Sequence, residues 1–185
     1  MKNRVIQYLR QPWNLLNILF YTASVIVLLF PAVRNGYPLL YSDSATYIVS
    51  GHDGYVPIDR PIVYGLIIRH ISMSSSLWFA VIFQSLILVL LINRFVGYFS
   101  SSHKKSLTTF LLVLFLTLFT GVSNYTSQIM PDIFTGIMIL AFIMLIAETN
   151  RHWRCIIWII ILVSSLVHFS NILLITSLCL IAVGY

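Results

Sequence analysis

The stretch from Tyr41 to Arg69, YSDSATYIVSGHDGYVPIDRPIVYGLIIR, organises the rest of the chain. It is polar and charged, and it lies between two runs that are apolar enough to enter a membrane. The chain has 5 acidic residues in all, and this stretch holds Asp43, Asp53 and Asp59. We therefore look for the fold in the apolar runs and for function in this stretch.

The composition is that of a membrane protein. Of 185 residues, 59% are hydrophobic and 9% are charged, and the mean hydropathy is +0.93. A bilayer core needs about 20 apolar residues for each helix that crosses it. We predict an all-α, polytopic integral membrane protein that forms a single transmembrane module over residues 1–185, with about five to six transmembrane helices. We therefore expect the lipid bilayer to be one of its partners.

The net charge of +6 and the pI near 9.6 would suit a nucleic-acid-binding protein. No soluble basic domain is left to bind nucleic acid, however, and the charge is better explained by orientation in a membrane. The expected spans are Leu15–Val33, Leu77–Ile92, 107–121 and Ile133–Ala147. From Cys155 onward the sequence fits either one long helix or two short helices that meet near His168 to Asn171.

The basic residues set the predicted orientation. The positive-inside rule places Met1, Lys104 and Arg151 in the cytoplasm, so the loop 34–76 and the connection 124–132 face outward. We expect a multi-pass protein of the cell membrane with a cytoplasmic N-terminus. His168 lies about 22 Å beyond Trp153 along a helix, toward the outer leaflet. Because the chain stops inside the apolar run LCLIAVGY, we expect it to be truncated at the C-terminus.

The first outer loop is predicted to contain two short helices. Ser42 can cap a helix that has Asp43 in its first turn, and Gly51 is a natural terminator. Pro61 suits the first position of a second helix, over Pro61–Ile71. That helix has a broad apolar side and is predicted to lie in the membrane interface.

Each candidate functional residue also has a structural explanation. Asp43 is either a helix-end carboxylate or a base or metal ligand held at the membrane surface. Arg60 and Arg69 could bind a phosphate with forked hydrogen bonds, or could snorkel or pair with Asp59. Asp132 follows Pro131 at the start of a span, where a helix N-terminus alone favours a carboxylate.

His168, in HFSN, is either a hydrogen-bonded interior histidine or a ligand or acid. The sequence has no metal-ligand spacing, nucleophile elbow or glycine-rich phosphate loop. The candidate site is instead topological, because separate segments bring Asp43, Asp132 and His168 to one membrane face.

Three pieces, YSDSATY, DRPIVYGLIIR and SQIMPDIFTG, carry a family resemblance. A span, an outer loop that opens with an aspartate, an Arg-Pro interfacial helix and a short acidic outer turn together resemble the N-terminal half of the polytopic GT-C glycosyltransferases. Members of this family transfer a sugar from a polyprenyl-phosphate donor to an acceptor outside the cytoplasm. The resemblance implies a membrane glycosyltransferase of the cell envelope, or the N-terminal module of one.

The resemblance also implies roles for individual residues. Asp43 would be the catalytic aspartate that deprotonates or orients the acceptor, and Arg60 would face the lipid phosphate. Asp132 matches a second acidic residue, which in some members helps a divalent metal or the donor. His168 has no secure counterpart in the family. We group Tyr41, Arg69 and His168 with Arg60 as candidate substrate-binding residues.

Two questions stay open at this point. The metal requirement is one of them, with Asp43 and Asp132 as the candidate ligands. The other is the class of the protein, because a non-enzymatic multi-pass protein is the alternative, such as a lipid-carrier flippase, a transporter piece or an assembly subunit. In that case the charged residues would be structural pairs, and the partner could be another membrane protein.

Overall fold

The regular elements of the described chain are helices. The computed structural model describes residues 12–100 and 104–184, and within these ranges the one β pairing is an isolated bridge between Leu39 and Gln128. The predicted all-α fold is therefore confirmed. The basic segment 1–11, on which the predicted cytoplasmic N-terminus partly depends, lies outside the described residues.

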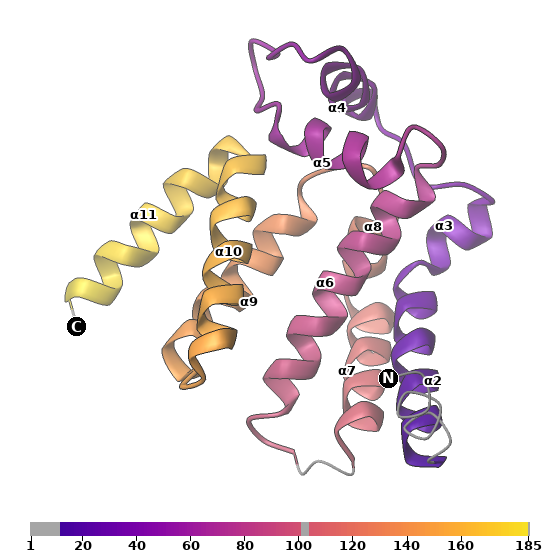
Figure 1. Cartoon of the computed structure of the whole chain (residues 1–185), viewed down its shortest axis with the longest axis vertical. Helices are drawn as coiled ribbons and strands as arrows, with labels where there is room; N and C mark the ends of the chain where they lie inside the picture. The colour runs from indigo at the N-terminus through magenta and orange to yellow at the C-terminus, as the bar shows by residue number, and fades with distance from the viewer. Residues whose placement is uncertain (1–11, 101–103, 185) are drawn as a thin grey trace, which may run out of the picture.

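Six longer helices form the body of the molecule (Figure 1). Neighbours pack in the order α2, α7, α6, α9, α10 and α11. Their bounds are Pro12–Leu28 for α2, Lys105–Phe119 for α7, Trp78–Val96 for α6, Ile133–Ala147 for α9, Arg151–Val167 for α10 and Phe169–Gly184 for α11.

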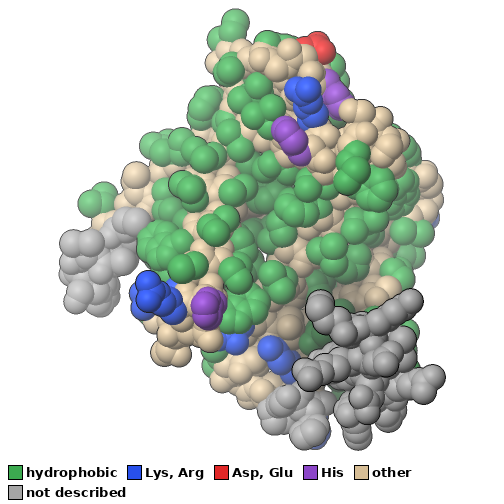
Figure 2. Space-filling view, in the orientation of Figure 1, with side chains coloured by type: hydrophobic (Ala, Val, Ile, Leu, Met, Phe, Trp, Pro, Cys, Tyr) green, Lys and Arg blue, Asp and Glu red, His purple; other side chains and the backbone are tan. Residues whose placement is uncertain are grey.

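Four shorter helices gather near one end of this body: α3 (Phe30–Asn35), α4 (Ser42–Asp53), α5 (Val63–Ser72) and α8 (Val122–Ser127). Figure 1 shows α4 and α5 covering that end, while the connections from α6 to α7 and from α9 to α10 lie at the opposite end. On the face drawn in Figure 2, charged side chains gather at the two ends and hydrophobic side chains dominate between them. We call the end covered by α4 and α5 the α4–α5 end.

By length and composition, α6 is the one described helix that could cross a membrane by itself. The apolar segments Leu15–Leu28, Lys105–Phe119 and Ile133–Ala147 are shorter. An α-helix rises 1.5 Å per residue, so these segments are several ångströms short of a hydrocarbon core about 30 Å thick.

The predicted first span, Leu15–Val33, is not one helix. The chain breaks at Leu29, between α2 and α3. Pro31 has no N–H to continue the helical hydrogen bonds. The Leu28 carbonyl accepts hydrogen bonds from the hydroxyls of Thr126 (2.9 Å) and Ser127 (3.2 Å) on α8.

The other boundaries divide into confirmed and corrected predictions. Ile133–Ala147 is a helix as predicted, and the region after Cys155 holds two helices that meet at His168. Gly51 does not end α4, which continues to Asp53 and closes on Gly54 in the left-handed conformation. The polar connection before Ile133 contains α8, which the sequence analysis does not predict.

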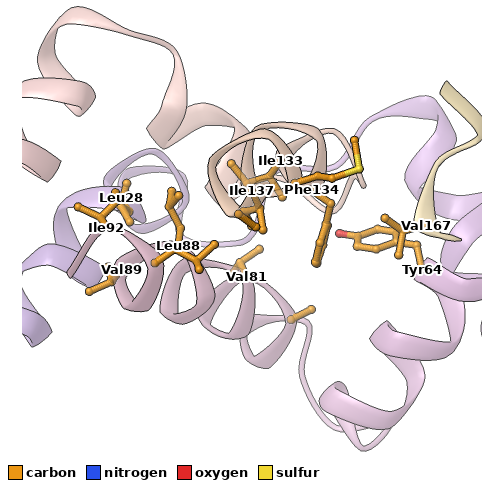
Figure 3. Packing of buried hydrophobic residues seen from close by; sticks show 14 of the residues in the cluster. Leu28, Tyr64, Val81, Leu88, Val89, Ile92, Ile133, Phe134, Ile137 and Val167 are labelled. Atoms are coloured by element: carbon orange, nitrogen blue, oxygen red, sulfur yellow. The ribbon is translucent and has the colours of Figure 1, made fainter. Parts of the chain in front are cut away.

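A buried polar residue ties the α4–α5 end to the body. The Gln84 amide on α6 donates to the carbonyls of Thr126 (2.9 Å) and Gln128 (2.8 Å) and accepts from the Tyr64 hydroxyl at 3.3 Å. Tyr64 itself packs edge-on against Phe134, and Figure 3 shows the two rings side by side. This contact fixes α5 over the ends of α9 and α10.

Candidate functional site

The candidate site centres on Arg60, just before α5. Its Nη2 donates to Oδ2 of Asp59 at 2.6 Å, and its Nη1 lies 3.2 Å from Oδ2 of Asp43. The second contact does not have hydrogen-bond geometry, so the buried Nη1 has no hydrogen-bond partner among the described residues. The Asp43 carboxylate therefore neutralises this nitrogen without giving it a well-aligned hydrogen bond.

Two carboxylates and an aromatic ring shape the electrostatics of this guanidinium. Its Cζ atom lies 5.3 Å from the centre of the Tyr47 ring, a cation–π distance. The hydrogen bond to Asp59, followed by the charge of Asp43, raises the pKa of Arg60, and the same hydrogen bond lowers the pKa of Asp59. Burial raises the pKa of Tyr47. The Arg60–Asp59 ion pair therefore stays charged throughout the physiological pH range.

The start of α4 holds Asp43 in place. The Tyr41 N–H donates to the Ser44 hydroxyl at 2.9 Å, and that hydroxyl donates to the Ile129 carbonyl at 2.9 Å. Tyr41, not Ser42, is therefore the N-cap residue, which corrects the predicted cap. Ser44 is buried, whereas the Asp43 side chain is 48% exposed, so the carboxylate is accessible on a rigid support.

The helices α4 and α5 cross at two glycines. A Cβ atom on Gly51 would overlap the Gly65 carbonyl group, and one on Gly65 would overlap the Tyr47 carbonyl oxygen. Only glycine permits backbones to approach this closely. The crossing brings Asp43 and Tyr47 on α4 against Arg60, which immediately precedes α5.

Asp132 and His168 form a second pair beside the first. His168 Nε2 lies 4.0 Å from Oδ1 of Asp132. The Ser170 N–H donates to His168 Nδ1 at 3.2 Å, so the ring carries a proton on Nε2, facing the carboxylate. The Asp132 side chain does not cap α9 by a hydrogen bond, although the residue occupies the N-cap position.

Two separate cavities border these groups. The first, of about 280 Å³, is lined by Asp43, Tyr47, Asp59, Arg60, Pro61, His168, Phe169 and Ser170. The second, of about 520 Å³, is lined by Tyr41, Gly121, Asn124, Tyr125, Gln128, Met130 and Asp132. We call them the Arg60 cavity and the Tyr125 cavity. The two predicted catalytic aspartates thus line different cavities, and Tyr41 is separated from Arg60 and His168.

Arg69, grouped with Arg60 in the sequence, is not brought to this cluster. It is exposed on α5 and lines neither cavity. Its Nη1 donates to the Gly51 carbonyl at 3.4 Å, across the glycine crossing. This contact supports the structural alternative for Arg69, which holds α5 to the last turns of α4.

The donor set does not fit a divalent metal. Within residues 12–100 and 104–184, no group of three His, Cys, Asp or Glu side chains is placed to hold an ion. Asp43 faces a guanidinium, and Asp132 faces a histidine proton. We therefore derive no chemical step through a metal at Asp43 or Asp132.

Sequence reasoning missed two features of the site and one charged contact elsewhere in the molecule. Tyr47 lies four residues after Asp43, and this spacing on a helix could have placed both on one face. Asn124 and Tyr125 lie in the polar connection before Ile133, where α8 is too short to give a periodic signal. The buried contact between Glu148 and Arg94 at the opposite end gave no local pattern.

Comparisons with family models, with curated proteins and with solved structures find no match to this chain. The functional assignment therefore depends on the geometry of the site and on the motifs in the sequence.

Proposed function

We propose that this chain is a GT-C-like membrane glycosyltransferase, or the N-terminal module of one, that uses a polyprenyl-phosphate sugar donor. The observation that carries the proposal is the buried Nη1 of Arg60, which has no hydrogen bond and lies beside the accessible Asp43 carboxylate in the Arg60 cavity. A phosphate oxygen would satisfy this donor. Arginine binds phosphate well because its planar guanidinium presents several N–H groups at once.

In the proposed reaction, Asp43 acts on the acceptor and Arg60 acts on the leaving group. An acceptor hydroxyl oxygen attacks the anomeric carbon of the donor sugar, and Asp43 takes the hydroxyl proton. The bond between the anomeric carbon and the phosphate oxygen breaks, and its electron pair leaves with the polyprenyl phosphate. Arg60 stabilises the negative charge that develops on this leaving group. The reaction is a displacement in which nothing is oxidised or reduced.

An apolar groove close to the Arg60 cavity is suited to the lipid part of the donor. It has a volume of about 550 Å³, lies between α5, α6 and α10, and is lined almost entirely by apolar side chains. Val63 in the groove is two residues from Pro61 in the Arg60 cavity, and Ser164 is one helical turn from His168. A phosphate at Arg60 could thus continue into an isoprenoid chain in the groove.

The same arrangement favours a multi-pass topology. Together, α6 and the shorter apolar helices form a bundle whose charged side chains gather at its ends (Figure 2). Spans shorter than the hydrocarbon core can be accommodated by local thinning of the bilayer. In our proposal the α4–α5 end faces outward, and the connection with Lys104 and that with Arg151 face the cytoplasm.

Replacement of Asp43 directly tests the proposed glycosyltransferase activity and the role of Asp43 as its base. In the intact protein in its native membrane, Asp43→Asn should lower sugar transfer from polyprenyl phosphate by at least about 100-fold, because the base is lost. Membrane insertion and thermal unfolding should not change. The matched control is Asp53→Asn, which removes an exposed carboxylate from the same helix. Full transfer by the Asp43→Asn protein would remove Asp43 from the mechanism.

The alternative is a non-enzymatic membrane component, such as a lipid-carrier flippase, a transporter piece or an assembly subunit. The 2.6 Å contact between Arg60 and Asp59 favours it, because a structural ion pair would have this geometry. Under this alternative, Asp59→Arg should impair the protein and a second change, Arg60→Asp, should restore it. A double variant as defective as either single variant would count against a structural pair.

A further inference from the structure

The Tyr125 cavity differs chemically from the Arg60 cavity. Its lining contains two tyrosines, the amides of Asn124 and Gln128, and the carboxylate of Asp132, and no lysine or arginine of residues 12–100 and 104–184 belongs to it. Tyr41 and Tyr125 are about half exposed, at 55% and 50%. Aromatic rings beside amide and carboxylate groups suit a ligand with both C–H faces and hydroxyl groups. The absence of a cation in this lining disfavours a phosphate.

The floor of the cavity is preformed. The Gln128 carbonyl accepts from the buried Gln84 amide at 2.8 Å, and the next residue, Ile129, donates its N–H to the Leu39 carbonyl at 2.9 Å. The side-chain amides of Asn124 and Gln128 make no hydrogen bond to any residue that the structure describes; Asn124 is exposed, whereas Gln128 is 6% exposed and reaches the cavity only at its lining. A fixed backbone with free amides resembles the usual small-molecule site.

The cavity is also placed beside the proposed base. Tyr41 lines the Tyr125 cavity and Asp43, two residues later, lines the Arg60 cavity, so the start of α4 separates the two. Asp132 lines the Tyr125 cavity while it faces His168 of the Arg60 cavity at 4.0 Å. The contact between Asp132 and His168 therefore makes the two cavities neighbours.

We propose that the Tyr125 cavity binds a neutral sugar, and that this sugar is the acceptor of the transfer reaction. The role of the sugar as acceptor depends on the proposed function, whereas the binding of a sugar in this cavity does not. The sugar ring packs against Tyr41 or Tyr125, and its hydroxyl groups pair with Asn124, Gln128 and Asp132. The two cavities then divide the substrates by charge, with the phosphate at Arg60 and the neutral acceptor at Tyr125.

Binding can be measured on the full chain in phosphatidylcholine nanodiscs, which avoid detergents with sugar headgroups. The probes are methyl glycosides of glucose, galactose and N-acetylglucosamine, observed by saturation-transfer NMR, and inorganic phosphate observed by 31P NMR. We expect at least one glycoside to bind, and Tyr125→Ala to weaken it by about tenfold or more. Phosphate binding should be unchanged by Tyr125→Ala and lost in Arg60→Gln.

Two control variants separate stacking from misfolding. Tyr125→Phe keeps the ring and should retain glycoside binding. Tyr55→Ala removes an exposed tyrosine that lines neither cavity, and should also bind normally. The inference is overturned if no glycoside binds, or if Tyr125→Ala and Tyr55→Ala bind the glycoside equally well.

The results distinguish failure of the sugar-site inference from failure of the proposed enzymatic function. Glycoside binding that depends on Tyr125, in a full-length protein that transfers no sugar, supports the sugar site and contradicts the enzyme. Sugar transfer that depends on Asp43, with no glycoside binding at Tyr125, supports the enzyme and overturns the sugar site.

Discussion

Two arginine–carboxylate contacts lie at opposite ends of this molecule, and they are built differently. Arg94 on α6 donates from Nε and Nη2 to the two oxygens of Glu148, at 2.6 and 2.7 Å. The Glu148 carboxylate also accepts from the Tyr98 hydroxyl at 2.8 Å and from the Asn150 N–H at 2.9 Å. Its side chain is 1% exposed. Both oxygens of this carboxylate are thus hydrogen-bonded within the protein.

The contact at Arg60 is incomplete by comparison. Its two carboxylates, Asp43 and Asp59, are 48% and 62% exposed, and its Nη1, 3.2 Å from Asp43, has no hydrogen bond to any residue that the structure describes. Both contacts use the same residue types, so composition does not distinguish them. The geometry of the Glu148 contact is that of a structural ion pair, whereas in our proposal the Arg60 cluster binds a ligand.

The largest stability effect is expected at Glu148. Glu148→Gln removes one charge of a buried pair and leaves Arg94 without its partner, which should lower the free energy of unfolding by about 3 kcal/mol. Thermal unfolding in detergent would measure it. If Asp59→Asn destabilised the protein as much, the proposed difference between the two contacts would be wrong.

A somewhat smaller effect is expected at the glycine crossing that positions the Arg60 cluster. Gly51→Ala forces α4 and α5 apart, because its Cβ atom would overlap the Gly65 carbonyl group. We expect a loss of about 1–3 kcal/mol. The control is Gly136→Ala on α9, where an added Cβ would contact nothing within 4 Å. Equal stability of the two variants in thermal unfolding would contradict the close approach of the helices.

The smallest effect is a pH dependence that comes from the Glu148 contact. Hydrogen bonds from Arg94 lower the pKa of Glu148 from 4.5 to about 2. A carboxyl group whose pKa is lowered by folding stabilises the protein above its unfolded pKa, and this contribution is lost as the pH falls toward the folded pKa. Between pH 7 and pH 3, the melting temperature should therefore fall more for the wild type than for Glu148→Gln. Parallel curves would contradict the lowered pKa.

The sequence predicts the helices better than it predicts the site. The apolar run Ile133–Ala147 can be read from composition, whereas the region after Cys155 fits either one long helix or two helices that meet near His168. The split at Leu29 cannot be read from composition, because it depends on hydroxyl groups of Thr126 and Ser127 that lie far along the chain.

The same limit applies to the charged residues. The topology brought Asp132 and His168 to one end, as the sequence suggests, with 4.0 Å between them. Arg60 and Arg69 look alike in the sequence, because both flank or belong to one amphipathic helix. Only the crossing of α4 and α5 decides that Arg60 faces Asp43 while Arg69 reaches the Gly51 carbonyl.

The most direct test of the account compares Arg60→Gln with Arg94→Gln in the intact protein, with sugar transfer and thermal unfolding measured on the same preparations. We predict that Arg60→Gln abolishes transfer and changes the free energy of unfolding by less than about 1 kcal/mol, because its carboxylate partners remain solvated. Arg94→Gln should cost about 3 kcal/mol, because it leaves Glu148 buried and unpaired. Retained transfer in Arg60→Gln, with a loss of stability equal to that of Arg94→Gln, would contradict the account and make both contacts structural.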